Sequence, residues 1–299
     1  MEICLNSQVY PRVTLMEEHT ERIKDHDYID GPEFYDDPDP VDASSFESKV
    51  WQPDDIGNDE NKTIWRYLDL SQLYIILEKE YLWFSHIRNF DDPYEGVYSD
   101  KTAEQIAEMY VDLFDYPEET AIKKAKMGNL SAYVNCWTNQ KNQSVALWEQ
   151  YVEGDKGVAI KTTSDNLKNA IVDNRQGIDL WQFIFGKINY VDYEKPMPQS
   201  DSAPVYHKRN SFGYEEEYRA AVFNYAQLAT DGAPKITQGG FEWPYEPGLK
   251  IDIDPTVLID ELYVSPTADS YFIEAVESIV TEYIDVEVKQ SHLFDDPLE

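Results

Sequence analysis

The segment from Tyr214 to Arg219 carries ionisable side chains at alternate positions. If a strand begins early in this segment, Glu215, Glu217 and Arg219 lie on one face, because successive side chains of a strand point to opposite faces. Two carboxylates and a guanidinium are costly to bury unless they pair with one another. The pattern therefore fits a wet sheet edge, a structural ion-pair network or a functional site.

Just before this segment stands the only tight basic triplet of the chain, His207-Lys208-Arg209. A basic cluster beside an acidic one can form a pocket for a small anion, with Lys208, Arg209 and Arg219 as its cations. Ion pairing of the same side chains at the surface is the alternative. The triplet thus predicts either an anion site or a set of ion pairs.

A third cluster, Asp91-Asp92-Pro93-Tyr94-Glu95, places three carboxylates in one turn. Asp91, Asp92 and Glu95 are weak candidates for a divalent cation, which prefers several oxygen ligands together. An aspartate-capped turn is the commoner cause of such a sequence. No spacing of Cys and His residues indicates a metal site, so we expect no firm metal centre.

Aromatic residues follow the strand that ends at Cys136-Trp137-Thr138. Trp148 and Tyr151 are three residues apart on an expected short helix, so they lie on one side of it. With partly exposed rings they would form a stacking wall for a planar ligand. Fully buried, they would simply belong to the core.

The elements that position these residues alternate along the chain after residue 62. Asp69 is an expected helix N-cap, with Gln72 at the capping-box position. Strands are expected over 63–67, 81–85, 132–137, 157–163, 184–193, 218–225, 249–253, 258–264 and 285–289, and helices after Asp69 and over 102–128 with a break near Pro117, 144–151, 165–172 capped by Ser164, and 268–283. This order predicts a single α+β domain over 62–299, with a mixed, largely antiparallel sheet and helices packed against it.

Residues 1–61 form an acidic N-terminal extension rich in proline and turn residues. It is expected to be a solvated arm, with a lid or a partner-binding tail as the functional alternative. Across the chain, 25 basic and 58 acidic residues give a net charge of −33. This charge repels phosphate backbones and anionic lipids, so nucleic acid is a disfavoured partner and a small anionic or nucleotide ligand would need a local basic pocket.

No apolar stretch approaches the roughly 18 to 20 residues of a membrane-spanning helix. Met1-Glu2-Ile3-Cys4 does not resemble a secretory signal, and Cys4 and Cys136 fit a reducing compartment. A cytoplasmic protein is therefore expected. The acidity fits either a high-salt cytoplasm or an ordinary acidic cytosolic protein.

An ordered set of short motifs, between residues 62 and 293, resembles the prokaryotic family called domain of unknown function 2971. The residues that carry this resemblance are Trp65-Arg66-Tyr67, 82–85, 90–96, Cys136-Trp137-Thr138, Trp148, Tyr151, 157–160, Phe212, Glu215, Glu217, Arg219, 264–266 and 289–291. The family name implies a domain but no established reaction.

The order of a strand-borne Arg66, a strand ending in Thr138 and a later Glu-x-Glu is also similar to the arginine, serine and glutamate layout of ADP-ribosyltransferases. The resemblance implies NAD as cofactor, with Arg66 and its neighbour Tyr67 binding its phosphates or ribose. Thr138, in place of the usual serine, would support the pocket, and Trp148 or Tyr151 would stack on nicotinamide.

In this layout Glu217 would be the catalytic carboxylate that stabilises an oxocarbenium-like transition state, and Glu215 would orient the acceptor. The hypothesis requires Arg66, Thr138 and Glu217 to meet in one cleft. If they do not meet, the transferase hypothesis fails.

Two other functions compete with the transferase. A non-catalytic module that binds a small anion, a nucleotide or a partner, for instance in defence or stress response, would use Glu215, Glu217 and Arg219 as a structural ion-pair network. A metal-dependent nuclease would take one metal ligand from Asp252 or Asp254, and Glu287-Val288-Lys289 resembles the Glu-x-Lys strand of such sites. The negative charge of the chain opposes this last alternative.

Overall fold

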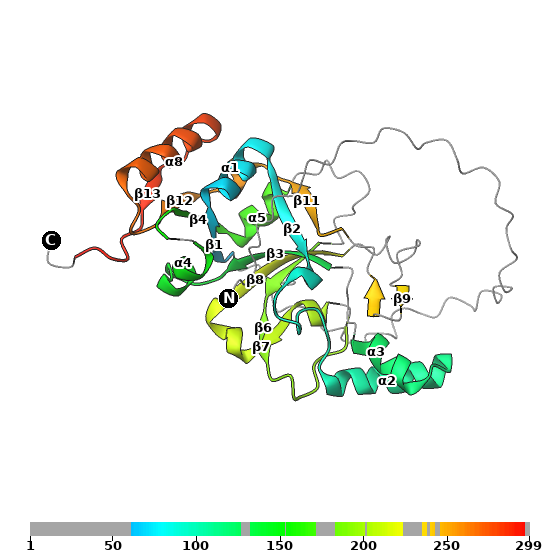
Figure 1. The fold of residues 1–299 in the computed structure, drawn as a ribbon. Coiled ribbons are helices and arrows are strands. Elements are labelled where there is room, and N and C mark those ends of the chain that lie inside the picture. The colour runs from blue at the N-terminus through cyan, green and yellow to red at the C-terminus, as the bar shows by residue number, and fades with distance from the viewer. Residues whose placement is uncertain are drawn as a thin grey trace, which may run out of the picture. The chain divides into compact units, whose positions relative to one another are not determined.

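The computed structural model describes residues 61–126, 132–152, 154–171, 183–200, 202–223, 235–237, 240–242 and 246–296. The expected N-terminal extension lies outside these residues, apart from Asn61. The helices and strands follow one another as in Figure 1: β1 (Thr63–Asp69), α1 (Leu70–Lys79), β2 (Tyr81–His86), η2 (Ile87–Asn89), α2 (Asp100–Phe114), α3 (Glu118–Lys126), β3 (Ala132–Thr138), α4 (Val145–Tyr151), β4 (Gly157–Thr163), α5 (Ser164–Ala170), β5 (Phe183–Lys187), β6 (Asn189–Val191), η4 (Ala203–Val205), β7 (His207–Arg209), η5 (Asn210–Glu215), β8 (Glu217–Phe223), β9 (Lys235–Thr237), β10 (Gly240–Glu242), β11 (Gly248–Asp252), α7 (Pro255–Leu258), β12 (Glu261–Val264), α8 (Ser270–Tyr283) and β13 (Val288–Gln290).

The first helix forms as its sequence predicts. The Asp69 side chain accepts a hydrogen bond from Gln72 N, and the Gln72 side chain accepts one from Asp69 N, which completes the capping box. Leu73, Ile76 and Leu77 lie on one face of α1 and are buried. The helix ends at Glu80, whose backbone is left-handed. A local cap and an apolar stripe are sufficient to fix this element.

A nine-stranded sheet forms the centre of the described chain, in the order β11-β2-β3-β1-β4-β12-β13, with β8 on β3 and β5 on β8. Strand β3 contacts β8 along its whole length, β2 through its first residues and β1 through its last residue. All neighbours in this sheet are antiparallel except β12 and β13. The α+β class with a mixed, largely antiparallel sheet is therefore confirmed.

The two faces of this sheet have different coverings. On one face α1, α5 and α8 contribute apolar side chains such as Leu73, Leu167 and Val276 to the largest core cluster. On the other face α4 packs on β1, with Leu147 and Trp148 against Trp65 and Tyr67. Helices α2 and α3 pack against each other around a small cluster of their own alanines. A side chain on one face of the sheet therefore packs against α1, α5 and α8, and a side chain on the other face lies on the side of α4.

Several element boundaries differ from the prediction. The expected strand 258–264 is shorter, because Asp254 caps a helical turn that begins with Pro255, and β12 starts only at Glu261. Helix α5 is capped by Thr163 and not by Ser164, whose hydroxyl accepts a hydrogen bond from Lys62 N instead. Strand 184–193 is divided into β5 and β6, which pair with different strands.

None of the helices in the described part of the chain has the length and apolar character that a bilayer crossing requires.

Candidate functional site

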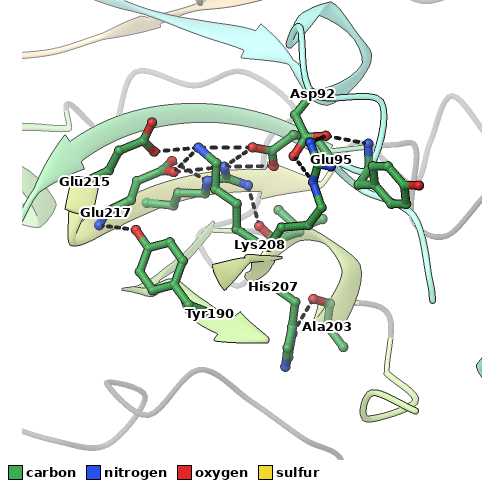
Figure 2. A network of polar contacts seen from close by, with 12 residues as sticks. Asp92, Glu95, Tyr190, Ala203, His207, Lys208, Glu215 and Glu217 are labelled. Atoms are coloured by element: carbon green, nitrogen blue, oxygen red, sulfur yellow. Dashed lines mark hydrogen bonds and ion pairs between the residues drawn. The ribbon is translucent and has the colours of Figure 1, made fainter. Parts of the chain in front are cut away.

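Five ionisable side chains from four separate segments meet on one face of the sheet. Glu217 and Arg219 come from β8, Glu215 from the end of η5, Lys208 from β7, and Glu95 from the turn that follows η2. Each of these residues is at most 6% exposed, and Arg219 is completely buried. We call this group the ion-pair pentad (Figure 2).

Lys208 binds three carboxylates at once. Its Nζ lies 2.6 Å from Glu215 Oε2, 3.1 Å from Glu217 Oε2 and 3.3 Å from Glu95 Oε1. The ammonium also lies 4.7 Å from the centre of the Phe212 ring. An ammonium group has three protons, so these three carboxylates match its hydrogen-bonding capacity. Lys208 occupies the position that a bound cation would take among the three acids.

Arg219 is the second cation of the pentad. Its Nη2 donates to Glu217 Oε2 at 3.1 Å and to Glu95 Oε1 at 3.0 Å, and its Nε donates to Glu217 Oε1. Its Nη1 donates to the carbonyl oxygen of Val205 at 2.7 Å. The guanidinium is thus held on all sides by the protein itself, as a buried charge requires.

The protonation of the pentad follows from these contacts. Burial alone would raise the pKa of Glu217, but Arg219 and Lys208 more than offset this and hold the pKa at about 2. Burial raises the pKa of Glu215, which Lys208 only partly opposes. Burial alone would lower the pKa of Lys208, but Glu217 and Glu95 outweigh it and the pKa is raised. The pentad contains three carboxylates and two cations, so one negative charge is in excess. Because the pKa of Glu215 is raised, we assign this excess charge to Glu215.

The backbone brings the two glutamates together in a way that strand alternation does not predict. Strand β8 begins only at Glu217, and Glu215 is the last residue of η5. Glu216 between them has a left-handed backbone with φ 43° and ψ 50°. This conformation is uncommon for a residue other than glycine. The expected early strand is therefore wrong, yet both carboxylates still bind Lys208.

Three further groups hold the carboxylates in place. The Thr138 hydroxyl donates to the carbonyl oxygen of Glu215 at 2.6 Å, and the backbone N–H of Glu217 donates to the Tyr190 hydroxyl at 2.8 Å. The Cys136 thiol is hydrogen bonded to the Glu217 carboxylate, which helps to keep the pKa of Glu217 low. Thr138 was an expected pocket residue, whereas no sequence signal indicated Tyr190.

The turn that supplies Glu95 is closed by its own aspartate. Asp92 Oδ1 accepts a hydrogen bond from Tyr94 N at 3.1 Å, and Arg209 donates to both Asp92 oxygens, at 2.8 and 3.2 Å. Gly96 follows with φ +73°, where a Cβ atom would lie 2.8 Å from the Ile87 side chain. Asp92 thus forms the capped turn that is the commoner explanation of this sequence, and Glu95 belongs to the pentad.

No metal site forms from Asp91, Asp92 and Glu95. Asp91 is exposed at the surface. Within the residues that the structure describes, no group of three or more His, Cys, Asp and Glu side chains could hold a metal ion.

The basic triplet does not form an open anion pocket. Lys208 is bound by the pentad, Arg209 by Asp92, and His207 Nδ1 lies 2.6 Å from the carbonyl oxygen of Ala203. Burial lowers the pKa of His207, which favours its neutral form. Lys208 and Arg209 therefore form ion pairs, but Lys208 does so in a buried position and not at the surface, as the alternative expected.

Arg66 lies on the opposite face of the sheet from the pentad. Trp65 is the register partner of Thr138, and Thr138 is the register partner of Glu217, so these three side chains share one face. Arg66 follows Trp65 in the strand and therefore points to the other face. There its guanidinium lies 5.8 Å from the centre of the Trp137 ring. Thr138 and Glu217 meet as expected, but Arg66 does not join them.

The remaining expected cofactor residues are on the pentad face but belong largely to the core. The ring of Trp148 meets that of Tyr67 edge to face, with centroids 4.9 Å apart, and both residues are at most 5% exposed. The Tyr67 hydroxyl accepts a hydrogen bond from Ser144 N, and burial raises its pKa to about 12. Tyr151 lies close enough to the pentad that Glu215 adds to the effect of burial and raises its pKa. Trp148 and Tyr67 are thus packed in the core, and Tyr151 packs against the same cluster near enough to Glu215 to feel its charge.

The residues of the nuclease hypothesis do not come together. Asp252 ends β11 at one edge of the sheet, and Lys289 lies on β13 at the other. Asp254 caps α7 through Thr256, and Lys289 binds Glu261 at 2.8 Å. A two-metal site needs its carboxylates within a few ångströms of one another, and this topology separates them.

The sequence has no match among family models or among curated proteins. The resemblance to the domain of unknown function 2971 family therefore stays an expectation. Two solved structures of DarT from Thermus sp. 2.9 are similar to the chain. The complex with carba-NAD+ gives a TM-score of 0.32 and 11% identity over 77% of this chain and 94% of that one, and the complex with NAD+ gives 0.33 and 10% over 77% and 95%. Similarity at this level establishes neither a shared fold nor a shared function.

Proposed function

We propose that the chain is a non-catalytic binding module that recognises a positively charged partner, and that the pentad is a structural ion-pair network. The observation that carries this proposal is the closure of the pentad. Glu217 accepts hydrogen bonds from both cations, and Lys208 and Arg219 have every described donor directed at protein oxygens. A carboxylate bound in this way is poorly placed to bind a ribose hydroxyl.

The position of Arg66 supports the same proposal. A transferase of the expected layout needs Arg66 beside Thr138 and Glu217, and the pleat of β1 directs it to the other face of the sheet. The transferase hypothesis therefore fails in the form that requires Arg66, Thr138 and Glu217 to lie in one cleft.

The distribution of charge favours a cationic partner over a small anion. The cations of the basic triplet are neutralised inside the protein by Glu95, Glu215, Glu217 and Asp92. The charges of Lys208 and Arg209 are therefore not available to hold a phosphate, while 58 acidic residues against 25 basic ones attract positively charged molecules. Among the binding functions considered, this favours partner binding over anion or nucleotide binding.

A second candidate is an ADP-ribosyltransferase-like enzyme that uses NAD, centred on Glu215 and Glu217 without Arg66. One observation favours it: the left-handed backbone of Glu216 stands between the two carboxylates, and strained backbone is concentrated at functional sites. In this alternative Glu217, ionised because its pKa is about 2, would stabilise an oxocarbenium-like transition state, and Tyr151 would lie beside the nicotinamide. The pentad would have to open to admit the cofactor.

Turnover of NAD+ separates the two candidates. Purified protein is incubated with NAD+, and released nicotinamide is measured by mass spectrometry for the wild type, Glu217→Gln, Glu215→Gln and the remote control Glu261→Gln. The binding module predicts no release above a protein-free blank for any of them. Titration calorimetry with NAD+ is expected to give no saturable heat.

Release by the wild type and by Glu261→Gln, together with its loss in either pentad variant, would overturn the proposal in favour of the transferase. Glu215→Gln is included because it retains both cation–carboxylate pairs of Glu217 and is expected to fold even where Glu217→Gln does not. Circular dichroism of each variant excludes loss of fold as the cause of lost activity.

A further inference from the structure

A small pocket that shares no lining residue with the pentad lies where α4 meets the turn after β12 and the segment after β13. It has a volume of about 60 Å³, and its lining includes Val145, Trp148, Glu149, Thr267 and Phe294. One buried water needs roughly 10–15 Å³ of such volume. The pocket therefore holds the end group of one side chain, whereas a dinucleotide site requires several hundred Å³.

The lining combines two aromatic rings with a carboxylate. Trp148 is 5% exposed and lies at the inner side, whereas Phe294 is 58% exposed and stands at the surface. Glu149 is exposed beside them, and no lysine or arginine of the described residues pairs with it. The hydroxyls of Ser265 and Thr267, 3.2 Å apart, also line the pocket. Aromatic rings next to an unneutralised carboxylate attract a cation of matching size.

A guanidinium matches this set better than an ammonium does. It is planar, so it stacks on an aromatic ring, and it has five N–H donors for a carboxylate and for hydroxyl oxygens. It is also less strongly hydrated than an ammonium, so it loses less on entering a partly apolar pocket. The overall negative charge brings positively charged chains toward this surface.

We propose that this pocket binds the guanidinium of an arginine side chain presented by a basic partner protein, with Trp148 and Phe294 as the apolar walls and Glu149 as the counter-charge. This rests on the proposed function, which it deepens by naming the group that is recognised. No residue that lines the pocket belongs to the pentad, so variants of the two sites can be tested separately.

The probe is the blocked peptide acetyl-Gly-Gly-Arg-Gly-Gly-amide, added to the full-length protein with the same peptide containing citrulline as a neutral match of equal shape. Binding is followed by NMR through the indole N–H signals, with that of Trp148 assigned by Trp148→Phe. The arginine peptide is expected to shift the Trp148 signal saturably. Because a charge-assisted contact to the carboxylate is lost, Glu149→Gln is expected to weaken binding about tenfold, and the citrulline peptide to bind about tenfold less tightly.

Two variants make the test specific. Phe294→Ala removes an exposed ring without disturbing the core and is expected to weaken the arginine peptide several-fold. Glu104→Gln removes an exposed helical acid on α2, outside the pocket, and is expected to change nothing. The proposal would be overturned if the arginine and citrulline peptides bound equally well, or if Glu149→Gln bound the arginine peptide as tightly as the wild type. It would also be overturned if Glu104→Gln weakened binding as much as Glu149→Gln does, because binding would then reflect only the overall negative charge of the protein.

Absence of peptide binding together with absence of nicotinamide release would reject the pocket but leave the non-catalytic proposal standing. Nicotinamide release that depends on the pentad would reject the proposed function whatever the peptide does. The two failures are thus distinguishable.

Discussion

Thr138 and Glu217 are register partners on adjacent antiparallel strands, and the Thr138 hydroxyl donates to the carbonyl of Glu215, two residues before Glu217. This relationship fixes which face of the sheet carries the two carboxylates. Because Trp65 is the partner of Thr138 on the other side, it also fixes the opposite face for Arg66.

Glu215 and Glu217 are expected to contribute very differently to stability. Glu217 binds both cations, so Glu217→Gln leaves Arg219 and Lys208 underpaired and is expected to cost roughly 3–5 kcal/mol, as for loss of one partner of a buried pair. Among the described cations Glu215 forms an ion pair with Lys208 alone, and it is the acid to which we assign the excess negative charge. Glu215→Gln is therefore expected to change the free energy of unfolding by less than about 1 kcal/mol in either direction.

Urea unfolding followed by circular dichroism at pH 7 gives both values. The control is Glu261→Gln, which removes a partly exposed carboxylate of β12 that is bound by Lys161 and Lys289. An exposed pair of this kind is expected to contribute about 0–1 kcal/mol. Equal losses for Glu215→Gln and Glu217→Gln would contradict the assignment of the excess charge to Glu215.

The contribution of Glu217 is expected to depend on pH in one direction. Its pKa is about 2 in the folded protein, against 4.5 for an ordinary glutamate. A carboxylate whose pKa is lowered by folding contributes stability that is complete above its unfolded pKa and is lost as the pH falls toward its folded pKa. The difference in unfolding free energy between wild type and Glu217→Gln is therefore expected to be constant above about pH 5.5 and to shrink steadily below about pH 4.5.

Unfolding titrations at pH 7, 5.5, 4.5 and 3.5 measure this difference directly. Other acids also titrate in this range, but they do so in both proteins and largely cancel in the difference. A difference that stays constant down to pH 3.5 would show that folding does not lower the pKa of Glu217.

Local sequence signals account for much of the fold. The capping box of Asp69 and Gln72, the break near Pro117 and the apolar stripe of α1 were all predicted, because each depends on residues within a few positions of one another. The same holds for the α+β class, which follows from the order of the elements. The helical turn at Pro255 was missed although Asp254 and Pro255 form a regular N-terminal signal.

Only part of the site could be predicted from the sequence, because the site depends on contacts between distant segments. That Glu215, Glu217 and Arg219 would either pair or be exposed follows from the cost of burying charge. Which strand lies beside which, and in what register, depends on contacts between distant segments, and a shift of one residue reverses every side chain. Arg66 was therefore wrongly expected to share a cleft with Thr138 and Glu217, and Tyr190 and Glu95 could not be recognised as partners of β8.

Tyr190 is expected to matter for stability although nothing in the sequence marks it. Its hydroxyl accepts the backbone N–H of Glu217, a residue that is 5% exposed. Tyr190→Phe leaves that N–H without an acceptor in a buried position and is expected to cost about 1–3 kcal/mol. Hydrogen exchange at the Glu217 amide is expected to accelerate in the same variant. Tyr271→Phe, at an 81% exposed tyrosine of α8, serves as the control and is expected to change neither value.

Glu216 offers a test of backbone strain. Its φ of 43° is accessible to glycine without a side-chain penalty. Glu216 is exposed, so Glu216→Gly removes no packed group and is expected to leave stability unchanged or raise it by up to about 1 kcal/mol. Glu216→Val, a β-branched residue that resists this conformation, is expected to destabilise the protein by more than about 1 kcal/mol. Equal stability of the two variants would mean that the chain relaxes out of the left-handed conformation.

The division of the sheet into two faces can be tested by double-mutant cycles. Lys208 and Glu217 are in direct contact, so the effects of Lys208→Met and Glu217→Gln are expected to be non-additive by about 1–3 kcal/mol. Arg66 and Glu217 lie on opposite faces, so Arg66→Met and Glu217→Gln are expected to add within about 0.5 kcal/mol. Both cycles share Glu217→Gln, and each is measured by urea unfolding at pH 7. Coupling between Arg66 and Glu217 as large as that between Lys208 and Glu217 would place Arg66 with the carboxylates and would restore the three-residue layout that the strand register opposes.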